Sequence, residues 1–88
     1  MNGGNQDRPI QSFSVRVDST GSGFLLVRGM EAFELDTVGV AIWQRCDGQT
    51  TVSEIAEALT QEFNVEEPTA RADTIRFVSA LRDAGLLE

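Results

Sequence analysis

The fold is decided by residues 33–55, which read FELDTVGVAIWQRCDGQTTVSEI. The alternation of apolar and polar residues stops at Asp36, and beyond it the apolar residues recur at helical spacing. Thr51 begins a Thr-x-x-Glu capping box, in which two side chains satisfy backbone N–H groups at the start of a helix. The stretch therefore predicts the end of a strand followed by two helices.

Upstream of this stretch, the apolar pattern has a period of two. Residues 12–18 alternate, residues 24–28 form a more continuous apolar run, and residues 32–35 alternate again. Turn-forming residues separate the three runs at positions 19–23 and at Gly29. We expect three antiparallel strands joined by tight turns.

Helical spacing continues to the end of the chain. We expect a first helix that begins at Asp36 or Thr37 and stops at Gly48, and a second from Thr51 to Phe63. A third helix begins near Pro68, a residue suited to a first helical position. The predicted fold is α+β, with three strands followed by three helices that pack on one face of the sheet.

The third helix is expected to end in a Schellman arrangement. Gly85 fits the left-handed residue that follows a helix, and Leu86 would then contact Leu81. The inner face of this helix is expected to consist of Thr74, Phe77, Val78 and Leu81.

The length allows one small domain. A chain of 88 residues buries only roughly 60–65% of its unfolded surface, which limits it to one compact core. Residues 1–11 are polar and rich in Gly and Asn, so we expect a flexible tail there and a domain over residues 12–88.

Composition excludes several classes of function. The formal charge is −7, which opposes binding to the phosphates of nucleic acid, and histidine is absent, which removes the commonest metal ligand. We therefore expect no metal, no cofactor and no enzymatic activity. No apolar run approaches a membrane span and no signal-peptide pattern begins the chain, so a cytoplasmic protein without a membrane partner is expected.

Other notable residues have structural interpretations. Cys46, the only cysteine, and Trp43, the only tryptophan, have the spacing of core residues. The acidic groups Glu31/Glu34/Asp36 and Glu66/Glu67 lack the patterns of carboxylate catalysis or of a calcium loop. Their expected roles are solvation and helix capping.

The two last helices admit a second interpretation, a DNA-reading helix-turn-helix. The helix over residues 68–84 carries three arginines, but the helix over residues 51–63 carries three glutamates and no basic residue. A winged-helix DNA-binding regulator is therefore kept as an alternative function, with net electrostatic repulsion against it.

The third strand suggests a binding surface. In a three-stranded meander it lies at the edge of the sheet, where its backbone N–H and C=O groups are free to pair with an extended peptide. On the third helix, Ile75 lies off the inner face, between Arg71 and Arg82. Strand and helix together could form a groove for a peptide; a plain solvated edge remains the alternative.

The chain resembles the PqqD-like family of winged helix-turn-helix domains. The resemblance covers residues 13–87 and rests on Leu35, Gly39, Ile42–Trp43 and the spacing Asp-Gly-x-x-Thr-Val-x-Glu-Ile over residues 47–55, followed by the C-terminal pattern Phe77–Val78, Leu81, Gly85–Leu87. Asp36 stands where the family commonly has Asn, and Asp caps a helix equally well.

The resemblance implies a RiPP recognition element, a domain that holds the leader of a ribosomally synthesised precursor peptide as a strand added to the third strand, against the third helix. It also implies a separate partner: a leader peptidase, as in lasso-peptide pathways, which we favour for a free-standing domain, or a radical-SAM enzyme served by a PqqD-type peptide chaperone. The residues expected to bind the peptide are Glu31, Ala32, Phe33, Glu34, Leu35, Arg71, Ile75, Val78 and Arg82.

Overall fold

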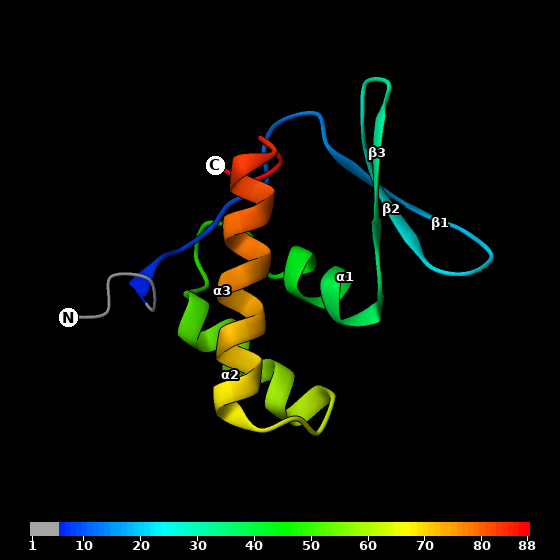
Figure 1. Ribbon diagram of the computed structural model, residues 1–88. Coiled ribbons are helices and arrows are strands. Elements are labelled where there is room, and N and C mark those ends of the chain that lie inside the picture. The colour runs from blue at the N-terminus through cyan, green and yellow to red at the C-terminus, as the bar shows by residue number, and fades with distance from the viewer. Residues whose placement is uncertain (1–5) are drawn as a thin grey trace.

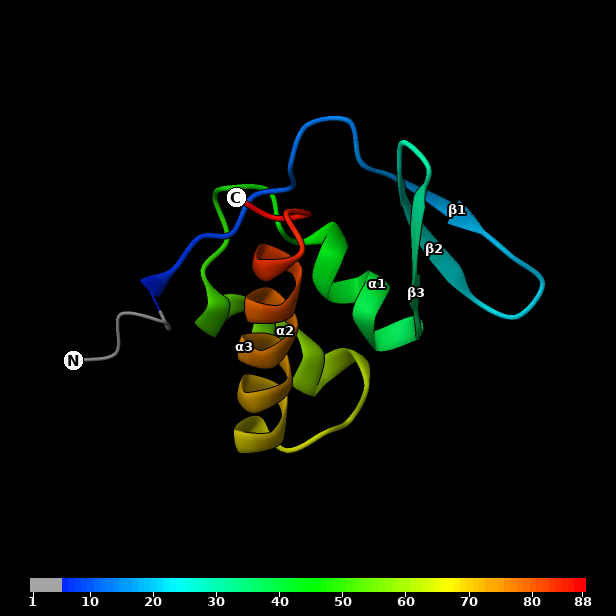
Figure 2. The ribbon, with the colours of Figure 1, turned by 45° about the horizontal axis from the view of Figure 1, so that its top comes forward.

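The computed structural model describes residues 6–88, and these begin with a three-stranded antiparallel sheet. The strands are β1 (Arg16–Ser19), β2 (Phe24–Arg28) and β3 (Glu31–Leu35), in the spatial order β1-β2-β3. The sheet stands beside the helices, and β3 is the strand nearest to them (Figures 1 and 2). The expected meander is confirmed.

Three helices follow: α1 (Thr37–Gln44), α2 (Val52–Glu62) and α3 (Glu67–Asp83). Helices α2 and α3 pack against each other, and α1 lies between them and the sheet (Figure 1). The α+β fold predicted from the sequence is confirmed. None of the helices in residues 6–88 is both long and apolar enough to cross a membrane.

The helix ends follow the local signals. Asp36 accepts a hydrogen bond from the Gly39 N–H at 2.7 Å and so caps α1. Thr51 and Glu54 form the predicted capping box of α2, at 2.8 and 3.1 Å. At the end of α3, the Leu86 N–H donates to the Leu81 carbonyl at 2.8 Å, as the Schellman motif requires.

The core lies almost entirely among the helices. Its buried apolar side chains come from α1, from Cys46 just after it, from α2, α3 and the C-terminal residues. Among residues 6–88, Leu26 is the one contribution from a strand. Trp43 and Cys46 are both buried, as predicted. These buried residues are Leu26, Ala41, Ile42, Trp43, Cys46, Val52, Ile55, Ala56, Leu59, Ala70, Val78, Leu81, Leu86 and Leu87.

Two boundaries differ from the predictions. The first strand begins at Arg16, because the chain turns at Ser14, which has φ = 70°, and leaves Phe13 exposed. Helix α1 ends at Gln44, and Gly48, with φ = 79°, instead serves a turn in which Asp47 accepts hydrogen bonds from the following backbone.

The segment before residue 12 contacts the domain. Pro9 is buried, and the backbone of Ile10 and Gln11 bridges to Asp47 and Leu87. Figures 1 and 2 show this segment, in blue, beside the end of α3. The expected flexible tail thus differs from the structure over residues 7–11, and we propose to extend the domain back to Asp7. Residues 1–5 of the tail lie outside the described residues.

Candidate functional site

The free edge of β3 is the first component of the site. Among residues 6–88, β3 pairs with β2 on one side, and its other edge ends the sheet. Phe33 lies opposite Leu26, which is buried, so Phe33 and its alternate neighbours face the helices. Glu34 lies opposite Leu25 on the other face of the sheet. An extended peptide can therefore pair with this edge and point every second side chain toward the helices.

A groove runs beside this edge, between the end of β3, α1 and α3. It consists of two adjoining hollows of about 650 and 430 Å³, which share Asp36, Gly39 and Phe77. We call it the β3–α3 groove; it is lined by Glu34, Leu35, Asp36, Val38, Gly39, Ile42, Asp73, Arg76, Phe77 and Ala80. The larger hollow also extends to the β1–β2 hairpin, where Thr20, Ser22, Gly23, Phe24 and Leu25 line it. Its floor is apolar, which suits the side chains of a bound peptide.

Gly39 allows β3 and α3 to approach each other at one end of the groove. A Cβ atom at this position would lie 3.2 Å from Cε2 of Phe77 and 3.4 Å from Cδ2 of Leu35. Because glycine carries no side chain, these two residues close over the start of α1. Phe77 is consequently half-buried, at the border between the core and the groove.

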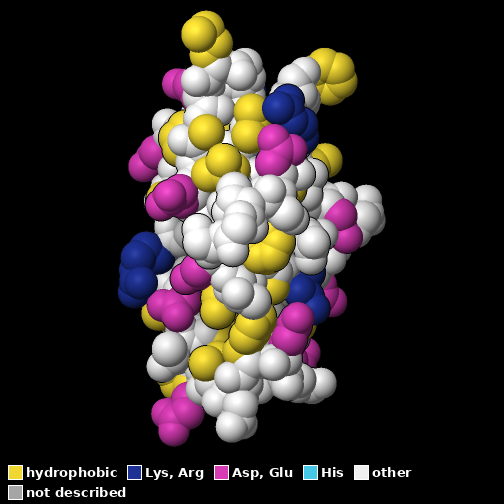
Figure 3. Space-filling model, turned by 90° about the vertical axis from the view of Figure 1, so that its right-hand side faces the viewer, with side chains coloured by type: hydrophobic (Ala, Val, Ile, Leu, Met, Phe, Trp, Pro, Cys, Tyr) yellow, Lys and Arg dark blue, Asp and Glu magenta, His cyan; other side chains and the backbone are white. Residues whose placement is uncertain are grey.

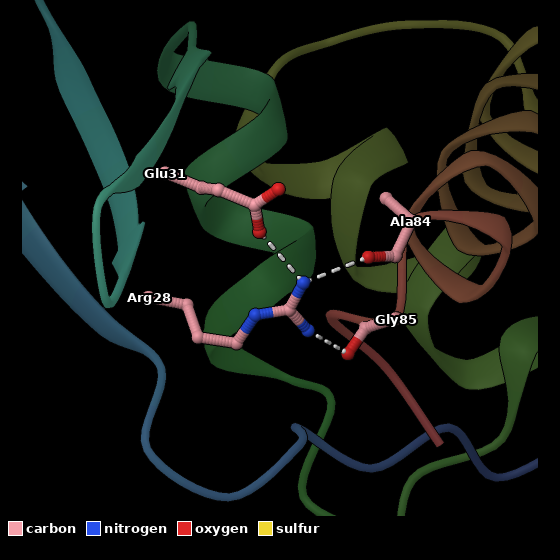
Figure 4. A network of polar contacts seen from close by, with 4 residues as sticks. All are labelled: Arg28, Glu31, Ala84 and Gly85. Atoms are coloured by element: carbon pink, nitrogen blue, oxygen red, sulfur yellow. Dashed lines mark hydrogen bonds and ion pairs between the residues drawn. The ribbon is translucent and has the colours of Figure 1, made fainter.

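Arg28 lies at the other end of the β3–α3 groove. Its guanidinium donates to the carbonyls of Gly85 at 2.6 Å and of Ala84 at 3.2 Å, and it pairs with Glu31 at 2.9 Å (Figure 4). It thereby connects the β2–β3 hairpin to the end of α3.

Acidic groups border the groove. Glu34, Asp36 and Asp73 line it, and Arg76 is bound to Asp73 at 3.2 Å. On the face of the molecule that carries the sheet, hydrophobic side chains gather with acidic ones around them (Figure 3). The groove therefore has an apolar floor and an acidic border.

The structure separates the two halves of the predicted site. Residues Glu31–Leu35 form the edge strand, as expected. On α3, the predicted residues lie on one stripe and those that line the groove lie on another, rotated by two positions or about 200°. The first stripe consists of Arg71, Ile75, Val78 and Arg82; the second consists of Asp73, Arg76, Phe77 and Ala80.

The predicted stripe does not face β3. Val78 is buried in the core with 3% of its surface exposed, while Ile75, which is 43% exposed, lies beside a separate hollow with Asp7 and Val52. Arg71 pairs with Glu67 within its own helix. These α3 residues therefore lie apart from the β3–α3 groove, and peptide binding by them and by β3 stays a prediction.

Arg82 is bound to the N-terminal segment. Its guanidinium makes a two-pronged ion pair with the carboxylate of Asp7, with one contact at 2.7 Å. The hydrogen bond from Arg82 lowers the pKa of Asp7, and the same bond raises the pKa of Arg82. Asp7 thus joins the start of the domain to α3.

Cys46 offers no reactive thiol. Burial is the main cause that raises its pKa to about 12, and its Sγ donates to the Ile42 carbonyl at 3.2 Å. Among residues 6–88, no three His, Cys, Asp or Glu side chains are grouped so that they could hold a metal ion.

Residues 23–87 match the family coenzyme PQQ synthesis protein D (PqqD). A PqqA binding protein of Xanthomonas oryzae pv. oryzae is 30% identical over 70 residues, which cover 80% of this chain and 76% of the relative. The bifunctional coenzyme PQQ synthesis protein C/D of Methylorubrum extorquens is 28% identical over the whole chain, which spans only 24% of that relative's length.

Solved structures share the fold. The solution NMR structure of the PqqD truncation of Methylobacterium extorquens PqqCD, described as a functional, stand-alone RiPP recognition element, matches with a TM-score of 0.83 and 27% identity over 100% of this chain and 99% of that chain. Lasso peptide synthetase B1 complexed with the leader peptide matches with a TM-score of 0.80 and 25% identity over 93% of this chain and 99% of that chain.

Proposed function

The chain belongs to the PqqD family, and from that membership we propose that it is a recognition element for the leader of a ribosomally synthesised precursor peptide. The single observation that carries the proposal is the free edge of β3 beside an apolar groove. The solved relatives support it, because one is a complex with a leader peptide and another is a RiPP recognition element.

The leader peptide would bind as a fourth strand. Backbone hydrogen bonds to Glu31–Leu35 supply sequence-independent affinity, and the groove selects the side chains that point toward α1 and α3. The residues that we now assign to recognition are Glu31, Ala32, Phe33, Glu34 and Leu35 on β3, with Phe77 and Ala80 on α3.

The domain would accelerate a reaction without catalysing it. By holding the leader, it raises the local concentration of the attached core peptide at a separate enzyme. We assign the chain no catalytic step of its own. Because precursors of this class are made by ribosomes, we place the encounter in the cytoplasm.

We favour a leader peptidase of a lasso-peptide pathway as the partner, with a radical-SAM enzyme as the second candidate. Lasso peptide synthetase B1 and the PqqD truncation match this chain with similar TM-scores, 0.80 and 0.83. Binding of the purified chain to each class of enzyme, in the presence of its leader peptide, separates the two pathways: the partner that forms a ternary complex identifies the pathway.

The positive charges that DNA binding would need are paired with acidic side chains. Each arginine of α3 is bound to an acidic side chain: Arg71 to Glu67, Arg76 to Asp73 and Arg82 to Asp7. A phosphate that approaches one of these arginines also meets the carboxylate paired with it, which repels the phosphate. Titration with a DNA duplex at several salt concentrations is the test, and tight, salt-sensitive binding would favour the regulator.

The main experiment is a selection for peptides. The wild-type chain is presented with a library of random-sequence peptides, and the enriched peptides are titrated in solution. We expect extended peptides with apolar residues at alternate positions, because alternate side chains face the groove. If no peptide is enriched and DNA binds, the proposal fails.

Two variants of α3 then locate the site. Ala80→Glu places a carboxylate in the groove, and Ile75→Glu places the same group on the opposite side of the same helix; both positions are exposed. We expect Ala80→Glu to weaken peptide binding by at least about tenfold, a difference of about 1.4 kcal/mol. We expect Ile75→Glu to bind like the wild type. The reverse result would return the site to the stripe predicted from the sequence.

A further inference from the structure

The sheet is attached to the helices by few polar contacts. Among residues 6–88, the hydrogen bonds that join a strand to the helical part of the molecule are those of Arg28 to the carbonyls of Ala84 and Gly85. The remaining attachment is apolar, through Leu26 in the core and the half-buried Phe33 and Leu35. Arg28 is therefore the directional contact between the β2–β3 hairpin and α3.

The end of α3 suits a cation. The last carbonyls of a helix lack partners within the helix and carry partial negative charge. The guanidinium reaches the carbonyls of Ala84 and Gly85, the two residues that follow α3, and is held from the other side by Glu31 (Figure 4). Gly85 keeps this place free, because a Cβ atom there would lie 3.0 Å from Nη1 of Arg28.

These contacts determine the geometry of the β3–α3 groove. Arg28 ends β2 and pairs in register with Glu31, the first residue of β3, while Leu35 meets Phe77 around Gly39 at the other end. The distance between β3 and α3 is thus fixed at both ends. Beside α3, the hollow lined by Val38, Phe77 and Ala80 is left open for a peptide.

We infer that Arg28 is a positioning residue, which holds the edge of β3 at the spacing from α3 that an added peptide strand requires. The inference rests on the proposed function, since it concerns the same groove. Arg28 does not need to touch the peptide. Without it, the hairpin is held only by its apolar contacts, and peptide binding must also order the hairpin, which lowers affinity.

The test compares Arg28→Gln with Arg16→Gln. Both variants remove one positive charge from a strand by the same substitution. Within residues 6–88, however, the guanidinium of Arg16 pairs only with Asp18, at the sheet surface. Amide hydrogen exchange of the free protein reports on the hairpin, and titration reports affinity for a peptide that the wild-type chain has selected from the random library.

We expect Arg28→Gln to accelerate amide hydrogen exchange in the hairpin around residues 29–35 and to leave exchange in α2 unchanged. The same variant should lower the affinity for the peptide by about tenfold. Arg16→Gln should do neither. Arg28→Lys, whose ammonium can reach one carbonyl but lacks the fork of a guanidinium, should give an intermediate affinity and also serves if the glutamine variant is unfolded.

The inference is overturned if Arg28→Gln binds the peptide like the wild type, or if both glutamine variants weaken it equally, which would make the effect one of net charge. Failure of the proposed function looks different. In that case the wild-type chain selects no peptide, while hydrogen exchange of the free variants still decides whether Arg28 holds the hairpin.

Discussion

The helical half of the molecule and the sheet are built for different tasks. The helices carry nearly the whole buried core, a capping box and a Schellman motif. The sheet contributes Leu26 to that core and leaves the edge of β3 without a partner. Folding free energy therefore comes mainly from the helices, whereas the sheet remains incomplete until another strand pairs with it. Stability and recognition can vary separately in such a domain.

The same substitution in each half should give the largest contrast. Leu59, in α2, is 1% exposed, whereas Leu25, in β2, is only half-buried on the outer face of the sheet. We expect Leu59→Ala to lower the free energy of unfolding by about 2–5 kcal/mol, as for other buried leucines. Leu25→Ala should lower it by about 1 kcal/mol or less, in line with the smaller apolar area lost.

Denaturant titration of both leucine variants measures the difference. Equal losses would mean that the sheet contributes to the cooperative core as strongly as the helices, and the comparison between the halves would fail.

The capping box provides a smaller test within the helical half. The Thr51 hydroxyl accepts from the Glu54 N–H, and the Glu54 carboxylate accepts from the Thr51 N–H. Thr51→Ala should cost about 0.5–2 kcal/mol of unfolding free energy, because the helix loses a capped N–H. Thr51→Ser keeps the hydroxyl and should retain most of the unfolding free energy that Thr51→Ala loses. The peptide affinity of both variants should equal that of the wild type at temperatures where they are folded.

The helices could be predicted because their signals are local. Asp36, the pair Thr51 and Glu54, and Gly85 each act within a few residues of their own position, so the sequence alone locates the helix ends. The edge position of β3 also followed from the order of the strands.

The face of α3 that lines the groove could not be derived in this way. Both stripes of α3 contain a large apolar residue, Phe77 on one and Ile75 on the other. The side that meets β3 depends on the path of α1 across the domain, and Gly39 makes that path possible by letting Phe77 approach Leu35. The spacing of residues within α3 does not indicate which side meets β3.

The contacts of the N-terminal segment have no local signal in the sequence either. Residues 7–11 are polar in composition, yet the Val52 N–H donates to the Asp7 carbonyl at 2.8 Å and the Gln11 N–H donates to the Cys46 carbonyl at 3.1 Å. These bonds connect distant parts of the chain through the backbone, which carries no sequence pattern. The contacts of Arg28 with the end of α3 are likewise long-range.

The smallest expected effect comes from Asp7, which ties this segment to the helical half. Its pKa is lowered from 3.8, first by the hydrogen bond from Arg82, so ionised Asp7 stabilises the folded state above that value. The contribution is lost as the pH falls below 3.8 and through the folded pKa, because protonation removes the charge that Arg82 binds. Since both side chains are partly exposed, the pair should be worth only about 0.2–1 kcal/mol.

Asp7→Asn should therefore lower the free energy of unfolding slightly at neutral pH. It should also reduce the dependence of this free energy on pH below 3.8, where Asp47, whose pKa is also lowered, still contributes. Asp18→Asn removes a more exposed aspartate–arginine pair with a single contact from the sheet and should change the free energy of unfolding by less than about 0.5 kcal/mol. Urea titrations at neutral and acid pH measure both variants. If Asp18→Asn costs as much as Asp7→Asn, the N-terminal segment adds nothing to the helical half beyond an ordinary surface ion pair.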